Sequence, residues 1–158
     1  LPGGVLTQKN DPRILPMGKF LRKTKINELP QLVNVFVGQM SIVGPRPVVR
    51  RHYDLYSDAV KREIDKVPPG LSGIASIVFR DEEELLDQVQ GNRDYFHDMV
   101  IVPYKGDLEV WWVQHRTLAN YFKIIIMTVI VLFAPRSRVY HKWFKDLPPV
   151  PKELQELL

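Results

Sequence analysis

Apolar residues recur at helical spacing between residues 28 and 37 of the chain. Their i, i+3, i+4, i+7 pattern predicts a helix with one apolar face. Asn27 stands at the expected N-cap of this helix, and Gly38 stands where the helix is expected to end. The apolar positions of the pattern are Leu29, Leu32, Val33 and Phe36.

Downstream, the pattern predicts more helices, separated by turns rich in proline and glycine. The acidic run 81–84 begins one of them, where the helix dipole favours negative charge. The apolar, β-branched segment 71–79 is the best strand candidate, and 40–43 is another short apolar run. Helices are expected over 54–66, from 81 to about 91, over 95–102, from Pro103 through Trp112, and over 118–133.

These elements predict an α+β, helix-rich fold with short strands. A chain of 158 residues is long enough to bury a core in one compact domain. We expect the domain to occupy residues 1–135 and a basic, proline-rich tail to occupy residues 136–158.

Composition narrows the chemistry that the chain can perform. It contains no cysteine, which excludes disulfides, zinc–thiolate sites and cysteine nucleophiles. Lysine and arginine exceed aspartate and glutamate by 22 to 18, a net charge of +4 that suits phosphate-bearing partners. No nucleic-acid-binding signature accompanies this charge, so we expect no nucleic acid partner. The four histidines show no metal-binding spacing and are expected to be structural or exposed.

Candidate phosphate-binding residues gather between residues 20 and 47. Arg22 and Lys25 lie just before the helix that Asn27 caps, and a helix N-terminus with nearby cations can receive a phosphate. Glu28 in the first turn could hold a divalent metal, although such a residue is more often only a partner of the helix dipole. Arg46 could bind a phosphate through two hydrogen bonds. Its neighbours Pro45 and Pro47 restrict the backbone on both sides of this arginine.

Taken together, these motifs resemble the signature of the bacterial sugar transferase family, the monotopic polyprenyl-phosphate phosphoglycosyltransferases. The resemblance covers about residues 11–135, and the tail lies outside it. Its segments are Leu21-Arg22-Lys23, Glu28-Leu29-Pro30-Gln31, Asn34-Val35, Met40-Ser41-Ile42-Val43-Gly44-Pro45-Arg46-Pro47, Pro69-Gly70-Leu71-Ser72-Gly73 and Phe79-Arg80-Asp81-Glu82-Glu83-Glu84-Leu85-Leu86.

The resemblance implies an enzyme that transfers a sugar-1-phosphate from a nucleotide-diphosphate sugar, commonly a UDP-sugar, to undecaprenyl phosphate. This step initiates the assembly of surface polysaccharides or glycoconjugates. The resemblance also implies Mg²⁺ as cofactor and the cytoplasmic face of a bacterial inner membrane as location. Members of the family carry an N-terminal membrane helix as their main anchor. This chain is expected to lack that helix. Formation of a homo-oligomer is left open by the sequence.

Family roles can be assigned to individual positions. Glu28 takes the place of the metal-binding acid, and Arg22 that of a catalytic arginine. The nucleophile of the family is an Asp, and Asn27 occupies that position here. The substrate phosphates are assigned to Lys25, Pro45, Arg46, Pro47 and Arg80.

Asn27 is a departure because an amide cannot act as the nucleophile of the family mechanism. Four accounts are open: the chain is inactive, the lipid phosphate attacks the nucleotide sugar directly, Glu28 is the nucleophile, or another acid such as Asp81 or Glu82 serves. The alternative to an enzyme is therefore a silent relative that binds nucleotide sugar, lipid or a protein partner without turnover.

A membrane-surface association is also expected. The apolar run 124–134 is shorter than the roughly 18–20 residues that a membrane-spanning helix needs. A helix that lies in the bilayer interface and a core helix are both consistent with this run. Basic and aromatic residues after it favour contact with anionic lipid. They are Arg136, Arg138, Tyr140, His141, Lys142, Trp143, Phe144 and Lys145.

Overall fold

The computed structural model describes residues 29–134 and 138–158. Two three-residue strands in this part pair in parallel, β1 (Ser41–Val43) with β2 (Gly70–Ser72). The remaining elements are α2 (Leu29–Phe36), α3 (Arg50–Leu55), α4 (Asp58–Ile64), α5 (Ile74–Val78), α6 (Glu82–Gln88), α7 (Arg93–Phe96), the π-helical segment η2 (His97–Ile101), α8 (Val102–Gln114), α9 (Leu118–Phe133), α10 (Tyr140–Trp143) and the 3-10 turn η3 (Lys152–Leu154). The expected helix-rich α+β fold is confirmed.

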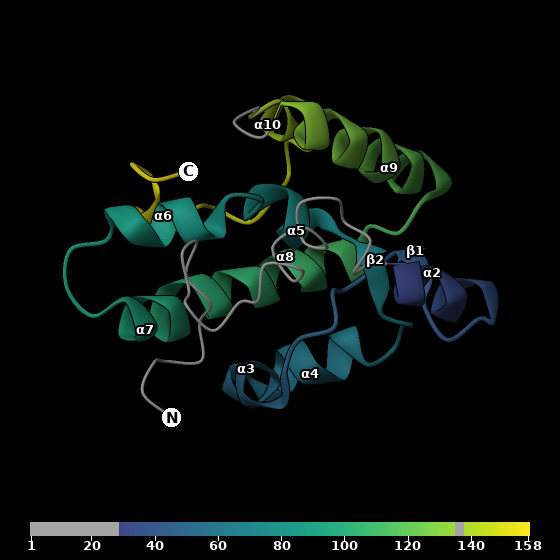
Figure 1. Ribbon diagram of the computed structural model, residues 1–158, viewed down its shortest axis with the longest axis horizontal. Helices are drawn as coiled ribbons and strands as arrows, with labels where there is room; N and C mark the ends of the chain where they lie inside the picture. Colours follow the sequence, from purple (N-terminus) through teal and green to yellow (C-terminus); the bar gives the residue numbers. More distant parts are fainter. Residues whose placement is uncertain (1–28, 135–137) are drawn as a thin grey trace, which may run out of the picture.

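Helix α8 forms the centre of the molecule. Figure 1 shows α3 and α4 on one side of it, α9 and α10 on the other, and the β1–β2 pair with α2 near one end. Its Leu108 and Trp112 are buried in a core that also contains Ile74 of α5 and Ile124 of α9. Because α8 contributes apolar side chains to several neighbours at once, it fixes the positions of the elements that surround the candidate site.

Two of the expected elements differ most from the observed ones. The helix expected over 54–66 is two helices, because Tyr56 turns into the core after α3 and Ser57 caps α4, accepting a hydrogen bond from Val60 N at 3.3 Å. The strand expected over 71–79 ends after Ser72 and continues as α5. Four of the five side chains of α5 are buried, so burial outweighs the β preference of its branched residues.

Helix α9 matches the expected range and has two different faces. Thr117 caps it, accepting a hydrogen bond from Asn120 N at 3.1 Å. Its Ile124, Met127 and Val131 are buried in the core. The other face leaves apolar side chains exposed, so the helix belongs to the core and to an apolar surface at the same time. These exposed residues are Leu118, Phe122, Ile126, Val129, Leu132 and Phe133.

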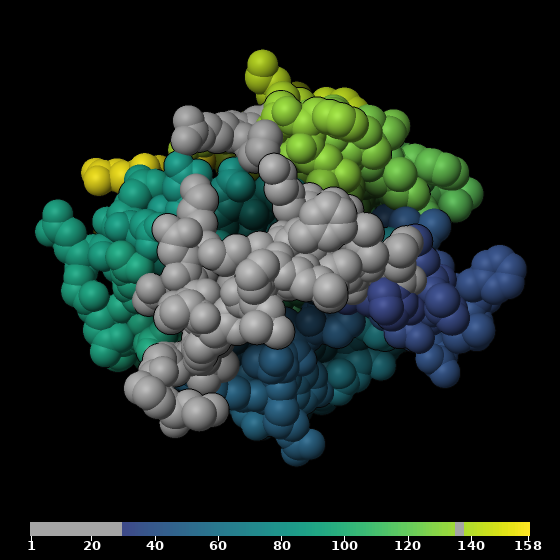
Figure 2. Space-filling view, in the orientation of Figure 1, coloured from purple at the N-terminus to yellow at the C-terminus, as the bar shows by residue number. Residues whose placement is uncertain are grey.

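None of the helices in the described ranges is both long enough and apolar enough to cross a bilayer. Helix α2 carries further exposed apolar side chains, Leu32, Val33 and Phe36. In Figure 2 this part of the chain projects from the edge of the molecule.

Residues 138–158 pack onto the helical core. Tyr140, Phe144 and Leu154 are buried, and Tyr104 OH donates a hydrogen bond to Pro148 O at 3.1 Å. The expectation that Tyr140 and Phe144 face lipid is therefore wrong, because core contacts take up both rings. Arg138, His141, Lys142 and Lys145 are exposed, and Arg136 lies outside the described residues.

Candidate functional site

The two motifs that follow β1 and contain β2 lie against each other. Gly44 N donates to Ser72 O at 2.9 Å, which continues the parallel pairing into the turn 44–47. A Cβ on Gly73 would lie 2.5 Å from Gly44 O, and a Cβ on Gly70 would overlap the Gly44 backbone. Only glycine allows this close approach. The contact places Arg46 beside β2.

Arg46 is held by its backbone and by its side chain. Its amide N donates to Glu109 Oε1 of α8 at 3.2 Å, and its Nη1 donates to Leu71 O at 3.4 Å. The arginine itself is exposed, whereas Glu109 is only 4% exposed. A buried acid thus fixes the backbone of an exposed cation at the site.

Glu109 has the ionisation behaviour of a buried acid. Burial raises its pKa to about 8, and the hydrogen bond from Arg46 and the charges of Lys105 and Arg46 offset only part of this effect. Its Oε2 has no hydrogen-bond partner among the described residues. Glu109 is therefore mostly protonated at neutral pH.

Glu82 at the start of α6 shows the opposite behaviour. Lys105 Nζ donates to its Oε2 at 2.6 Å, and His97 Nε2 lies 3.2 Å from its Oε1. Burial alone would raise the pKa of Glu82, but the contacts with His97 and Lys105 outweigh it and lower the pKa to about 2. Glu82 is ionised at neutral pH and orients Lys105, whose side chain is 20% exposed.

These groups line a cavity of about 870 Å³. Its charged lining includes the cations Arg46, Arg80 and Lys105 and the acids Asp81, Glu82, Glu83, Glu84 and Glu109. Arg80 Nε is buried without a hydrogen-bond partner in the described part of the chain. The volume lies within the ~300–1,000 Å³ of ligand pockets, and the cations suit a phosphate-bearing ligand.

Much of the cavity lining is apolar, and α9 contributes part of it. Ser72 Oγ and Thr128 Oγ1 share a hydrogen bond of 2.8 Å, which holds α9 against β2. The cavity thus offers both cations and apolar side chains, as a ligand with a phosphate and a hydrocarbon chain requires. Apolar side chains in the lining include Ile42, Ile125, Val129, Val131 and Leu132.

The structure brings together some of the site residues expected from the sequence. Arg46, Pro47 and Arg80 line the cavity, and Pro45 is buried beneath the turn. Asp81 and Glu82, the alternative acids, line it as well. The other expected site residues, Arg22, Lys25, Asn27 and Glu28, lie outside the described residues.

Sequence reasoning missed Lys105 and Glu109, which contribute to the same cavity from α8. Glu109 stands between Leu108 and Val110 in an otherwise apolar stretch, and an isolated acid in such a stretch was the available signal. Lys105 gives no comparable signal, because its partner Glu82 is 23 residues away.

Comparisons with known proteins identify relatives of this chain. An undecaprenyl-phosphate galactose phosphotransferase of Salmonella typhimurium is 38% identical over 124 residues, which cover 78% of this chain and 22% of that protein. A UDP-glucose:undecaprenyl-phosphate glucose-1-phosphate transferase of Klebsiella pneumoniae is 42% identical over 132 residues, 82% of this chain and 26% of that protein. The chain therefore spans about a quarter of the length of these relatives.

The exopolysaccharide production protein ExoY of Rhizobium meliloti is 40% identical over 100 residues, 60% of this chain and 44% of that protein. The family described as bacterial sugar transferase matches residues 2–135, a range that contains both motif turns and every described residue of the charged cavity lining. The chain belongs to the bacterial sugar transferase family.

Proposed function

We propose that this chain is the catalytic part of an enzyme that transfers a sugar-1-phosphate from a nucleotide-diphosphate sugar, a UDP-sugar by analogy with its relatives, to undecaprenyl phosphate. The observation that carries the proposal is the cavity beside the two family motifs, which is lined by Arg46, Arg80 and Lys105 and by apolar side chains of α9. The activities for which the relatives from Salmonella and Klebsiella are named support the same reaction.

The proposed reaction balances without an additional reactant. A new bond forms between an oxygen and the sugar-bearing phosphorus, and the bond from that phosphorus to the nucleoside phosphate breaks. The products are undecaprenyl diphosphate sugar and nucleoside monophosphate. Because charge shifts onto the bridging oxygen as this bond breaks, Arg46 and Lys105 act by stabilising negative charge on the phosphates. Glu109 and Glu82 keep these two cations in place.

Mg²⁺ is the proposed cofactor, and Glu28 its proposed ligand. The cavity offers ligands that suit such an ion, because the carboxylates of Asp81 and Glu83 line it and Mg²⁺ prefers hard oxygen donors. Glu82 and Glu109 are less suited, since Lys105 engages the first and burial keeps the second protonated. When bound, the ion would neutralise negative charge on the phosphates.

The proposed location is the cytoplasmic face of a bacterial inner membrane. The exposed apolar side chains of α9 and α2 support contact with a lipid surface, and the exposed cations Arg138, Lys142 and Lys145 support a preference for anionic lipid. In this arrangement the lipid phosphate reaches the cavity along α9, whose side chains line it.

The deciding experiment measures nucleoside-monophosphate release with undecaprenyl phosphate, Mg²⁺ and a panel of UDP-sugars. The parent chain and Asn27→Asp are compared in the same detergent or lipid. Turnover by the parent chain supports the proposed enzyme activity and means that the family mechanism with an Asp nucleophile does not apply to this chain. Turnover by Asn27→Asp alone identifies a silent relative with an intact site. If neither releases product while UDP-sugar still binds, the proposed transfer is wrong and binding without turnover takes its place.

A further inference from the structure

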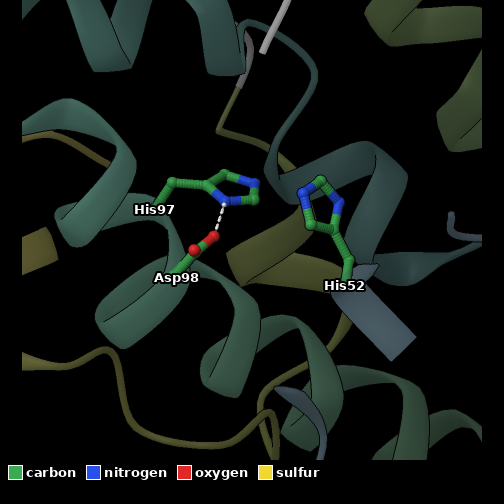
Figure 3. A group of neighbouring side chains, drawn as sticks. All are labelled: His52, His97 and Asp98. Atoms are coloured by element: carbon green, nitrogen blue, oxygen red, sulfur yellow. Dashed lines mark hydrogen bonds and ion pairs between the residues drawn. The ribbon is translucent and has the colours of Figure 1, made fainter. Parts of the chain in front are cut away.

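Three side chains on two separate elements converge at the edge of the cavity. His52 comes from α3, and His97 and Asp98 come from η2. Each residue offers one ligand atom, and these atoms lie within 4.8 Å of one another. The imidazole centroids of His52 and His97 are 4.7 Å apart, and Figure 3 shows the two rings facing each other.

The His97 ring is oriented as in a metal-binding histidine. Asp98 Oδ1 lies 2.9 Å from Nδ1 of His97, and Arg51 Nη2 donates to Asp98 Oδ2 at 2.6 Å. A carboxylate on one ring nitrogen fixes the imidazole and leaves the other nitrogen for a metal. That other nitrogen, Nε2, lies on the side of the ring that faces His52 (Figure 3).

His52 Nε2 is buried and lacks a hydrogen-bond partner within the described ranges. The buried Glu82 Oε1 lies 3.2 Å from His97 Nε2, so the second ring nitrogen of His97 faces a carboxylate oxygen. A buried polar atom without a partner needs an explanation. A cation held by His52 Nε2, His97 Nε2 and Glu82 Oε1 would give His52 a partner and would take the place of the contact between His97 and Glu82.

The charges around the cluster decide which cation fits. Asp98 is paired with Arg51 and Glu82 with Lys105, so the carboxylates are already neutralised. Attraction by charge alone is therefore weak, and the two imidazole nitrogens are the main donors. Imidazole suits Zn²⁺ and neighbouring transition metals, whereas Mg²⁺ prefers oxygen.

We propose that His52 and His97 bind a divalent transition-metal ion of the Zn²⁺ class, with Asp98 orienting His97 and Glu82 supplying an oxygen. The ion bridges α3, which follows the Arg46 turn, to the π-helical segment before α8. His52 and Glu82 also line the cavity, so the remaining coordination positions are open to it. This site does not use the proposed Mg²⁺ ligand Glu28 and does not depend on the proposed reaction.

The test measures Zn²⁺ retention by equilibrium dialysis of the chelator-treated chain, with any histidine tag removed and Mg²⁺ in excess. His52→Gln is the deciding variant because His52 is only partly buried and its loss leaves the core intact. His115→Gln is the matched control, since this half-exposed histidine pairs with Asp146 away from the cluster. We expect stoichiometric Zn²⁺ binding, weakened at least about tenfold by His52→Gln and unchanged by His115→Gln.

A second readout is the visible spectrum of the Co²⁺-substituted chain, which reports nitrogen ligation and which His52→Gln should change. His97→Gln is measured beside it, with circular dichroism to verify the fold. The proposal is overturned if Zn²⁺ is not retained, if His52→Gln retains it with parental affinity, or if Mg²⁺ displaces it. Retention that depends equally on His115 also overturns it.

Discussion

Glu109 makes the stability of the chain depend on pH in the direction opposite to most acids. Burial raises its pKa from 4.5 to about 8 in the folded state. Between these two values the folded chain binds a proton that the unfolded chain has released. The free energy of unfolding therefore falls as pH rises through this range and levels off above about pH 8, because the difference in bound protons has then disappeared.

We expect Glu109→Gln to remove this dependence, since Gln keeps the acceptor for Arg46 N and cannot ionise. The variant should be more stable than the parent at pH 9 by on the order of 1–4 kcal/mol, and similar to it at pH 5. Urea denaturation at both pH values measures the difference. Glu153→Gln, at an exposed position, is the control and should change neither value. Equal slopes against pH for parent and Glu109→Gln would contradict the assignment.

Arg46 is the residue whose side chain is expected to contribute to turnover without contributing to the core. Arg46→Met should lower kcat/KM for product release by about 10²–10³-fold, the usual effect of removing one charge-stabilising donor. The backbone hydrogen bond to Glu109 survives this substitution, so the thermal midpoint should stay close to that of the parent. Arg50→Met is the control, because the side chain of Arg50 is 91% exposed. A similar loss in both variants would indicate a general charge effect.

At the scale of elements, the contact between the two motif turns depends on glycine. Gly70→Ala should destabilise the chain by about 3 kcal/mol or more, because the added Cβ overlaps the Gly44 backbone and neither backbone can move without breaking the strand pair. Gly91→Ala is the comparison: its φ of +109° is strained for alanine, but the space around it is open. We expect a cost of about 1 kcal/mol there. Chemical denaturation that ranks the two variants the other way would refute the close approach.

Helix α9 should separate stability from lipid binding. Phe133 is 88% exposed, so Phe133→Ser should leave the unfolding free energy within about 0.5 kcal/mol of the parent and weaken binding to vesicles that contain anionic lipid. Met127→Ala, on the buried face, should cost about 2–5 kcal/mol. Vesicle co-sedimentation and denaturation give the two numbers. Unchanged vesicle binding by Phe133→Ser would remove this face from the proposed membrane contact.

Elements with local signals could be predicted from the sequence. Helix α2 has a clear apolar period, α6 begins with acids, and α9 has both a cap at Thr117 and a long, mostly apolar run. The strand expected over 71–79 failed because its later residues are buried as a helix against α8 and α9, a tertiary effect that local preference does not contain. The π-helical segment has no local signal either.

The residues of the candidate site also divide into those with a local sequence signal and those without one. Arg46 and Arg80 could be found because each lies in a contiguous motif. Glu109, Lys105 and the pairing of His52 with His97 could not, because their partners are distant in sequence and meet only after α8 has packed. The expectation that the four histidines are structural or exposed rested on sequence spacing, and spacing does not reveal a contact between two separate helices such as that of His52 with His97.

At the scale of the whole molecule, the C-terminal residues contribute to the core they cover. Leu154 is fully buried, and Leu154→Ala should cost about 2–5 kcal/mol. Leu118→Ala is the control, since this leucine is 79% exposed and should change stability little. Thermal or urea denaturation tests the pair. A negligible effect of Leu154→Ala would mean that residues 138–158 are not coupled to the core.

Because of the π-helical segment between α7 and α8, the geometry at the cavity edge depends on the exact number of residues in this part of the chain. Residues 93–114 form one continuous rod, and the wide turn at His97–Ile101 accommodates one residue more than an α-helical turn would. Removing a single residue there, for example the exposed Met99, would let the rod become regular. Everything on its N-terminal side would then rotate by roughly 100° about the axis. A one-residue deletion would turn His97 away from His52 while α8, and the acid that holds Arg46, stayed where they are.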